Sequence, residues 1–297
     1  MASQQTIGLI GVGLLGTAIA ERLLAANYEV LGFDLEPKQL EHLAQLQGST
    51  ANSAEPIFEQ CQTVIWSLPK SSDSLKVSEQ LIAGPSRPTK IVDTTTGDPD
   101  EIIAIADLLG QANIGYLDAT VAGSSQDVRD GVAVVMVGGK RKQFDQAQPL
   151  LNAIAPKTYY LGNSGSGSKM KLVVNLVLGL ERAVLAEGLA FAERLGIDLQ
   201  QALEVLKAGP AAARPMETKG EKMINGNYEP PQARLDQHKK DVEIILELGS
   251  KLDAHLPLSK LHHNLLQEAS KLGFGLQDNS SIMELFRAMG PGGRSSR

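Results

Sequence analysis

The first half of the chain alternates short apolar runs with longer amphipathic segments. The apolar runs are rich in β-branched residues and stop abruptly at glycine, proline or polar residues, as buried strands do. We predict strands at residues 6–10, 28–34, 63–69, 90–96, 114–120 and 132–139. Helical spacing at residues 13–27 and 37–48 follows the first two strands. Apolar strands separated by helices predict a parallel sheet that is covered on both faces.

The second half of the chain has a different pattern. Residues 168–195 form a near-continuous helical stretch of Leu, Val and Ala, and shorter helical patterns follow at 199–207, 235–252 and 258–272. Strand signals end near residue 165. We therefore predict an α/β fold with a Rossmann-like, doubly wound domain at residues 1–164 and an all-helical domain at 165–297, joined by a long helix. The last eight residues, GPGGRSSR, are expected to fray.

Length and composition agree with a two-domain globular protein and exclude several classes of function. The chain has 297 residues and a net charge of −6, which argues against a nucleic-acid partner. The single cysteine, Cys61, cannot form an internal disulfide and indicates a reducing compartment. Neither a secretory leader nor a membrane-spanning run is visible, and no metal-ligand spacing occurs. We expect a cytoplasmic protein.

A glycine pattern follows the first predicted strand and opens the first helix. The turn consists of Gly11, Val12, Gly13, Leu14, Leu15 and Gly16. The G-x-G-x-x-G pattern alone is weak, since glycines at such turns are often only turns. Here Asp34 also closes the second strand, where a carboxylate can bind the adenosine ribose of a dinucleotide and repel the extra phosphate of NADP. We predict that NAD is preferred, while Lys38 leaves NADP possible.

The third and fourth predicted strands end in SLPK and DTTTGDP, at the edge where a cofactor would lie. Leu68 and Pro69 close the third strand, and the threonines 94–96 close the fourth. Helix capping and cofactor contact are both compatible with these residues, and the pattern alone does not separate them.

The segment NSGSGSKMKLVVN, residues 163–175, leads a flexible loop into an apolar helix. We expect Gly162, Gly165 and Gly167 to bring the backbone close to a bound ligand. Lys171 and Asn175 are one turn apart and share a helix face. A partly desolvated lysine can move the hydroxyl proton that accompanies hydride transfer. The alternative is a lysine that simply extends to solvent.

The order of these motifs resembles the β-hydroxyacid dehydrogenases over nearly the whole chain. The motifs are GLIGVGLLG, SLP, DTTTGDP, DATVAGSS, GNSGSGSKMKLVVN and HKKD. That family includes 3-hydroxyisobutyrate dehydrogenases and glyoxylate/succinic semialdehyde reductases, and the C-terminal region looks most like the latter. The resemblance implies that Lys171 is catalytic and that Asn175 orients the substrate. It also implies that Thr96 contacts the nicotinamide end of the cofactor and that Lys240 closes over it.

The predicted substrate loop departs from the family pattern. DATVAGSS corresponds to the usual D-A-P-V-S-G-G, with Thr120, Ala122 and Ser124 replacing the proline, the serine and the last glycine. Gly123 is kept. The resemblance places Ala122, Gly123 and Ser124 at the substrate, and we expect a substrate carboxylate to lie against Gly123 and Ser124.

The predicted function is hydride transfer between a nicotinamide cofactor and a small β-hydroxy acid or aldehyde acid, with Lys171 as the general acid and base. Two alternatives are an imine reductase and a non-catalytic cofactor-binding or interaction module. Relatives of both kinds typically lack the lysine, so Lys171 argues against them. The pair His262–His263 offers no third metal ligand and is interpreted as surface or packing. The partners we expect are a small carboxylate substrate and further copies of the chain, in a homodimer or homotetramer.

Overall fold

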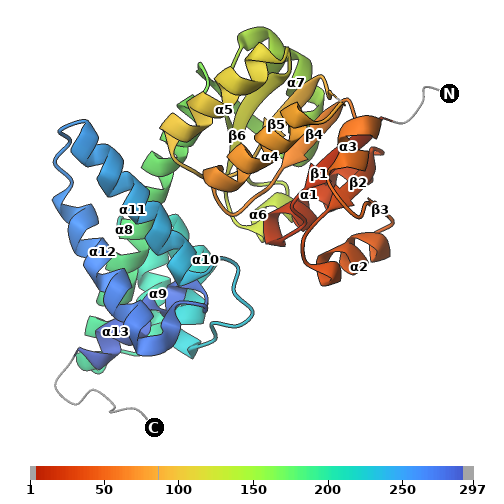
Figure 1. The fold of residues 1–297 in the computed structure, drawn as a ribbon. Helices are drawn as coiled ribbons and strands as arrows, with labels where there is room; N and C mark the ends of the chain where they lie inside the picture. Colours follow the sequence, from red (N-terminus) through yellow and green to blue (C-terminus); the bar gives the residue numbers. More distant parts are fainter. Residues whose placement is uncertain (1–4, 86, 290–297) are drawn as a thin grey trace. The chain divides into compact units, whose positions relative to one another are not determined.

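The computed structural model describes residues 5–85 and 87–289, so the predicted frayed tail at 290–297 lies outside the described residues. The chain divides into two compact units, Met1–Lys171 and Leu172–Arg297 (Figure 1). Within the described residues no helix is both long and apolar enough to cross a bilayer.

The first unit is built on an eight-stranded sheet in the order β3-β2-β1-β4-β5-β6-β7-β8. The strands are β1 (Thr6–Ile10), β2 (Glu29–Phe33), β3 (Ser49–Thr50), β4 (Thr63–Trp66), β5 (Lys90–Asp93), β6 (Gly115–Ala122), β7 (Val134–Gly139) and β8 (Lys157–Gly162). Since β2 and β4 lie on opposite sides of β1, the chain winds first one way and then the other from the middle of the sheet.

Both faces of this sheet are buried, which explains the continuous apolar runs. Side chains of consecutive strand residues point to opposite faces, so Ile65 packs in one core and its neighbours Val64 and Trp66 pack in the other. Helices α1 (Leu14–Ala25), α2 (Pro37–Gln45), α6 (Ser125–Arg129) and α7 (Arg141–Ile154) contribute to the first core. Helices α3 (Glu55–Gln60), α4 (Ser71–Ala83) and α5 (Pro99–Gln111) contribute to the second.

The expectation of an all-parallel sheet was wrong at one position. Strand β7 runs antiparallel to β6, whereas β1, β2, β4, β5 and β6 are parallel and β8 is parallel to β7. Only residues 123–133 connect β6 to β7, and their one helix, α6, has five residues. A parallel crossover needs about a dozen residues or more, usually with a full helix, so this short connection returns the chain antiparallel.

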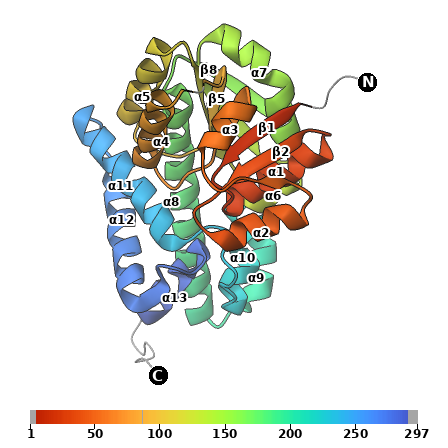
Figure 2. The ribbon, with the colours of Figure 1, turned by 45° about the vertical axis from the view of Figure 1, so that its right-hand side comes forward.

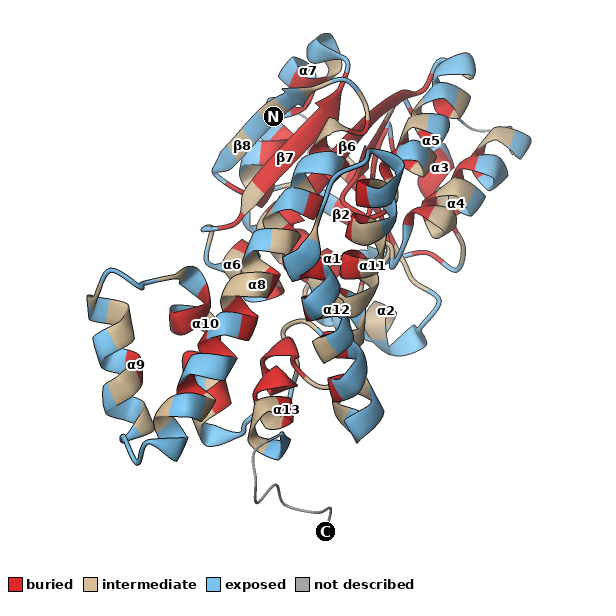
Figure 3. Cartoon of the chain, turned by 90° about the vertical axis from the view of Figure 1, so that its left-hand side faces the viewer, coloured by how far each residue is buried: buried red, intermediate tan, exposed pale blue. Residues whose placement is uncertain are grey.

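The second unit is helical, as predicted. Its elements are the continuation of α8 (Ser166–Arg194), then α9 (Leu199–Ala208), α10 (Arg214–Asn225), α11 (Leu235–Lys251), α12 (Pro257–Ala269), the π-helix η1 (Ser270–Phe274), the 3₁₀ helix η2 (Asn279–Ser281) and α13 (Ile282–Ala288). Helices α11 and α12 lie side by side (Figure 2). One apolar core joins α8 to the later helices, with Leu189, Leu203 and Met223 fully buried, while α9 and α12 also present exposed faces (Figure 3).

Candidate functional site

The carboxyl ends of β1, β4, β5 and β6 meet at one edge of the sheet, because these neighbouring strands are parallel. Ligands of open α/β sheets bind at this edge, at the point where the strand order reverses. Here the strand order reverses at β1, because β2 pairs with one side of β1 and β4 with the other. The glycine turn, Leu68, Pro69, Thr96 and the predicted substrate loop lie at the ends of these strands, and Asp34 lies at the end of β2.

The three glycines of the first turn have three different reasons to be glycine. Gly11 has φ +92°, and a side chain there would strike the carbonyl oxygen of Ser67. A Cβ at Gly16 would strike the carbonyl oxygen of Gly11, so this glycine lets α1 start tightly against the turn. A Cβ at Gly13 would meet nothing within 4 Å. The middle glycine therefore opens onto space, as a site for a close backbone–ligand approach requires.

Asp34 closes the other side of this turn. The Val12 amide donates to Asp34 Oδ2 at 2.6 Å, and the Glu36 amide donates to Oδ1 at 2.9 Å. Helix α1 begins at Leu14 without a side-chain cap, so its N-terminal amides keep the affinity for anions that such ends have. Leu14 is 55% exposed and Leu15 is partly buried. The turn, the helix start and the carboxylate together fit a dinucleotide with its pyrophosphate at α1.

Polar contacts between the next two strand ends fix their loops. The Leu68 amide donates to Thr95 Oγ1 at 3.0 Å, and the Thr94 hydroxyl donates to the Trp66 carbonyl at 2.8 Å. Thr94 and Thr95 are buried, whereas Thr96 is partly exposed and Pro69 is exposed. Two of the three threonines thus hold the sheet edge together, and Thr96 is the one placed toward the surface, as a cofactor contact needs.

The SGSGS loop packs closely against the sheet. The Asp118 carboxylate on β6 accepts hydrogen bonds from the Gly165 amide at 3.0 Å and the Ser168 amide at 2.9 Å. A Cβ at Gly167 would lie 2.5 Å from the Met136 carbonyl oxygen and 2.7 Å from that of Asp118. A Cβ at Gly165 would lie 3.0 Å from Ile103 of α5. Gly167 thus lets the start of α8 approach β6 and β7, and Gly165 lets the loop approach α5. The expected approach of Gly162, Gly165 and Gly167 to a ligand stays a prediction.

Burial gives Asp118 unusual acid–base behaviour. It is fully buried, and the loss of hydration raises its pKa to about 6, although the two amide hydrogen bonds oppose the shift. Asp93 on the adjacent strand β5 is also fully buried, and burial raises its pKa too. Both carboxylates open motifs noted in the sequence, DATVAGSS and DTTTGDP, but no role was predicted for either. The role of Asp118 depends on amides 47 and 50 residues away, which the motif does not reveal.

Lys171 reaches back to the sheet edge. Its Nζ donates to the Val121 carbonyl oxygen at 2.6 Å, next to the predicted substrate loop. The side chain is partly buried, so the alternative of a lysine extending freely to solvent does not describe it. The ammonium group thus lies beside the carboxyl end of β6, one residue before Ala122.

The predicted substrate loop makes an internal cap. Ala122 ends β6, and Gly123 has φ +138°. The amide and the hydroxyl of Ser124 both donate to Asp127 Oδ2 at 2.7 Å, and the Asp127 amide donates to Ser124 Oγ at 3.2 Å. This capping box closes the start of α6. Its sequence signal, S-x-x-D, is present at residues 124–127, and sequence reasoning overlooked it.

Within the second unit, Asn175 on α8 and Lys240 on α11 share a partner. Asn175 Nδ2 donates to Asp241 Oδ2 at 2.9 Å, and Lys240 Nζ lies 3.2 Å from Asp241 Oδ1. Asn175 and Asp241 are buried. The second unit therefore brings together the predicted substrate-orienting amide and the predicted cofactor-contacting lysine, through a carboxylate between them.

Two histidines pack where α11 and α12 approach α8. A Cβ at Gly179 would strike His238 and would lie 2.7 Å from His262. The two imidazole rings are 5.2 Å apart, and burial lowers the pKa of His262 to about 4. His263 points elsewhere and contacts Glu243 at 3.2 Å. The interpretation of His262 and His263 as packing and surface residues is confirmed.

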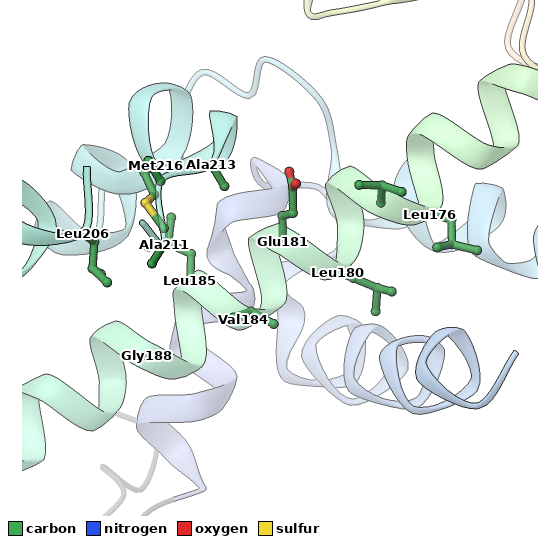
Figure 4. Close-up of a pocket in the computed structure, with 12 residues that line it drawn as sticks. Leu176, Leu180, Glu181, Val184, Leu185, Gly188, Leu206, Ala211, Ala213 and Met216 are labelled. Atoms are coloured by element: carbon green, nitrogen blue, oxygen red, sulfur yellow. The ribbon is translucent and has the colours of Figure 1, made fainter. Parts of the chain in front are cut away.

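A pocket of about 540 Å³ lies in the second unit (Figure 4). Its walls come from α8 and from the segment between α9 and α10. The lining residues are Leu176, Val177, Leu180, Glu181, Val184, Leu185, Gly188, Leu206, Ala211, Ala212, Ala213 and Met216. Val184 follows Asn175 by nine residues, or about two and a half helical turns, so it lies on the opposite face of α8. The pocket is thus apart from the predicted catalytic face. Among the described residues, no group of three or more His, Cys, Asp or Glu side chains could hold a metal ion.

Comparison with known proteins places the chain in a family. The family model described as the NAD binding domain of 6-phosphogluconate dehydrogenase matches residues 6–162. A second model, described as NAD-binding of NADP-dependent 3-hydroxyisobutyrate dehydrogenase, matches residues 165–286. A solved structure of 3-hydroxyisobutyrate dehydrogenase from Salmonella typhimurium is 25% identical with a TM-score of 0.88, and the match covers 95% of this chain and all of that one.

Curated relatives carry two kinds of name. Glyoxylate/succinic semialdehyde reductase 2 of Arabidopsis thaliana is 27% identical over 95% of this chain and 80% of its own. The cytokine-like nuclear factor N-PAC of Drosophila melanogaster is 25% identical over 94% of this chain, but this chain spans only 47% of N-PAC. The two family models together match residues 6–162 and 165–286. The chain belongs to the β-hydroxyacid dehydrogenase family.

Proposed function

We propose that the chain is an NAD(P)-dependent dehydrogenase or reductase. It transfers a hydride between the nicotinamide and the hydroxyl-bearing carbon of a small substrate, of the hydroxy-acid and aldehyde-acid kind named for its relatives. The observation that carries this proposal is the 2.6 Å contact of Lys171 Nζ with the Val121 carbonyl oxygen. It holds an ammonium group at the sheet edge, beside the loop predicted to bind the substrate.

Lys171 is the proposed general acid and base. In oxidation it accepts the proton of the substrate hydroxyl, and in reduction it returns that proton to the developing alkoxide. Asn175 is proposed to orient the same hydroxyl or carbonyl group from the next turn of α8. Its amide nitrogen is held by Asp241 at 2.9 Å, and this contact limits the rotation of the side chain.

The cofactor supplies or accepts the hydride when it is bound. The turn of residues 11–16 is proposed to hold its pyrophosphate, and Asp34 its adenosine ribose. Leu68, Pro69 and Thr96 are proposed to face the nicotinamide end, and Lys240 to contact the cofactor from the second unit. Asp34 supports NAD as the preferred form, because a carboxylate there repels the 2′-phosphate of NADP.

The test replaces Lys171 and follows chemistry and binding separately. We expect Lys171→Ala to lower kcat by roughly 10²- to 10⁴-fold, the usual contribution of a general acid or base. NADH affinity, measured by fluorescence titration, should stay within a few-fold, because the adenine half of the cofactor binds elsewhere. Lys171→Arg serves as the matched variant that keeps the charge but cannot give up its proton. A Lys171→Ala enzyme with near-normal kcat would refute the proposed role.

A second candidate function follows from the name of one group of relatives. N-PAC is named as a nuclear factor and not as an enzyme, so a non-catalytic cofactor-binding module is the alternative. The two functions differ in one measurement. An enzyme oxidises NADH or NADPH in the presence of short aldehydes or aldehyde acids, whereas a binding module takes up the cofactor without turnover. An imine reductase would instead turn over cyclic imines.

Two further proposals concern the state of the protein in the cell. We propose that it forms a homodimer or homotetramer, which the exposed apolar residues of α8 support. We also propose a cytoplasmic location, which is supported by the single cysteine, the buried Cys61, since it leaves no internal disulfide to form.

A further inference from the structure

Two side chains of β6 contact the start of α8 from the same face of the strand. Side chains two residues apart in a strand project from one face, as Asp118 and Thr120 do. Asp118 accepts hydrogen bonds from two backbone amides at the start of the helix. The Thr120 hydroxyl donates to the Gly167 carbonyl oxygen at 3.0 Å. Thr120 is fully buried, and the proposed reaction leaves its hydroxyl without a role.

The Gly167 carbonyl oxygen is also the backbone acceptor of Lys171. In an α-helix each amide donates to the carbonyl oxygen four residues before it, and α8 is helical from Ser166 onward. A carbonyl oxygen has two lone pairs, so that of Gly167 binds the Lys171 amide and the Thr120 hydroxyl together. The same hydroxyl lies 3.5 Å from the Met136 carbonyl oxygen, which is too long for a strong hydrogen bond. It therefore acts mainly on the turn that carries Lys171.

The side chain of Lys171 returns to the residue next to Thr120. Its Nζ donates to the Val121 carbonyl oxygen at 2.6 Å. Two consecutive residues of β6 thus hold the two ends of the lysine, since Thr120 fixes its backbone through Gly167 and Val121 fixes its ammonium group. Residues 117–122 of β6 are paired with β7, so the strand is a rigid reference for both contacts.

The neighbouring groups cannot take over the contact that Thr120 makes. An ionised carboxylate such as that of Asp118 only accepts hydrogen bonds, so it cannot bind a carbonyl oxygen. The turn also lies directly on the strands. A Cβ at Gly138 of β7 would lie 2.6 Å from the Asn163 carbonyl oxygen and 2.9 Å from the Ser166 nitrogen. Without the hydroxyl, the Gly167 carbonyl would keep its helical bond and lose its bond to the sheet.

We propose that Thr120 is a positioning residue for Lys171, because its hydroxyl binds the first turn of α8 to β6 and so holds the ammonium group at the sheet edge. The proposal rests on the general acid–base role of Lys171 proposed above. Proton transfer needs heavy-atom distances of about 2.6–3.2 Å, and a misplacement of about 1 Å can cost about 100-fold in rate. Loss of the hydroxyl should therefore slow the chemical step and spare the cofactor site on β1 and β2.

The test removes the hydroxyl and keeps the shape of the side chain. We expect Thr120→Val to lower kcat by roughly 10- to 100-fold, assayed with NADH or NADPH and with glyoxylate or succinic semialdehyde. Each kcat is expressed per bound cofactor, from fluorescence titration of the same sample, so that misfolded protein does not count. KM for the aldehyde acid and the affinity for the cofactor should stay within a few-fold, because the hydroxyl binds the protein's own backbone.

Two further variants identify the hydroxyl as the group responsible. Thr120→Ser keeps the hydroxyl and loses only the methyl group, so its kcat should stay within a few-fold of that of the wild type. Thr120→Cys carries a thiol, which is only a weak donor. It should lose kcat as Thr120→Val does, and it serves in case the valine variant folds poorly.

Thr89→Val is the matched control, since it makes the same substitution at the opposite edge of the sheet. The Thr89 hydroxyl donates to the Gln62 carbonyl oxygen at 2.9 Å, and the two residues directly precede β5 and β4. The bond is thus of the same kind but does not involve α8. We expect Thr89→Val to keep the kcat of the wild type.

The outcomes separate this inference from the proposed function. Wild-type kcat in Thr120→Val would overturn the inference, while loss of turnover in Lys171→Ala would still support the proposed reaction. A loss that Thr120→Ser or Thr89→Val shares, or one confined to KM or to cofactor affinity, would also overturn it. No turnover of either aldehyde acid with either cofactor would overturn the proposed function and the inference with it.

Discussion

At the scale of single residues, Asp34 should decide the choice of cofactor. We expect the wild type to favour NAD over NADP in kcat/KM, and Asp34→Ser to reduce that preference by roughly tenfold or more by removing the charge that repels the 2′-phosphate. The same carboxylate holds the Val12 amide at 2.6 Å, so NAD itself should also bind less tightly. Steady-state assays of the wild type and Asp34→Ser with NAD and with NADP give the ratio of the two kcat/KM values for each protein.

Glu36→Gln is the control for Asp34, because Glu36 is an exposed acidic residue two positions away. The preference of Glu36→Gln for NAD over NADP should match that of the wild type. A wild type that prefers NADPH would show that Lys38, which is exposed on the same segment, or another cation binds the phosphate instead.

Local patterns predicted only part of the site. The glycine turn, Asp34 and Lys171 were found because strand, turn, helix and charge follow one another within a short stretch of chain. Ser124 and Asp127 also carry a local signal, S-x-x-D, and could have been found with it. The sequence contains Asp118 in the motif DATVAGSS but does not show its role, since it binds amides 47 and 50 residues away that come close only when the start of α8 packs on β6.

At the scale of elements, the start of α8 should depend on Gly167. A methyl group there would lie 2.5 Å from the Met136 carbonyl oxygen and 2.7 Å from that of Asp118, and neither backbone atom can move without distorting a central strand. We expect Gly167→Ala to lower the free energy of unfolding by about 1–3 kcal/mol, as overpacking usually does. It should also lower kcat, because Lys171 follows one turn later. Urea unfolding and steady-state kinetics provide the two measurements.

Gly110→Ala on α5 is the matched control, because a Cβ at Gly110 meets nothing within 4 Å. Alanine is the better helix former, so this variant should be as stable as the wild type or slightly more stable. Equal stability of the two variants would mean that the packing of Gly167 on the sheet contributes nothing.

The elements missed by sequence reasoning depend on tertiary contacts. The direction of β7 follows from the length of the connection before it, which the apolar pattern of the strand does not record. Helix α10 contains Pro215 in its first turn and Gly220 in its interior, and few of its residues are apolar, so the sequence did not mark it as a helix. A Cβ at Gly220 would lie 2.6 Å from the Leu203 side chain of α9, so the two helices pack closely at this glycine. Helices α8, α9 and α11 were predicted within about two residues at each end.

At the scale of the whole molecule, the buried Asp118 should make stability depend on pH. Its pKa is raised to about 6, mainly by burial and in part by Asp93, whereas an unfolded aspartate titrates near 3.9. The native state therefore binds the proton more tightly, and its advantage is lost as pH rises from about 4 to about 6. Asp118→Asn removes this dependence, so the stability of the wild type relative to the variant should fall by roughly 1–2 kcal/mol between pH 4.5 and 6.5.

Trp66 makes this measurement specific to the first unit. It is the single tryptophan and is fully buried in β4, so its fluorescence reports the unfolding of the unit that contains Asp118. Urea titrations of the wild type and Asp118→Asn at the two pH values give the difference. If the stability of the wild type relative to Asp118→Asn instead rises with pH, the prediction is wrong. The native state would then stabilise the ionised carboxylate, through the Gly165 and Ser168 amides.

The second unit exposes an apolar stripe along α8. Val173, Val177, Val184 and Phe191 are between 47% and 67% exposed. Their spacing of four, seven and seven residues keeps them on one face, as in the seam between paired helices. The stripe borders the pocket of about 540 Å³, whose lining is apolar apart from Glu181. One surface thus offers both a ridge and a groove, the self-complementary arrangement that two-fold symmetric dimers use.

We therefore expect a second copy of the chain to cover this stripe. Val184→Glu would place a charge in the middle of it, where an apolar contact would have to bury that charge, and should convert the oligomer to monomers. Leu35→Glu is the control, because Leu35 is 87% exposed in the first unit. Size-exclusion chromatography with light scattering gives the mass of each. Val184→Glu mixed with Val184→Lys should recover the wild-type mass if the two stripes face each other, since opposite charges would then pair. A wild-type monomer, or a Val184→Glu protein of unchanged mass, would exclude this face as the interface.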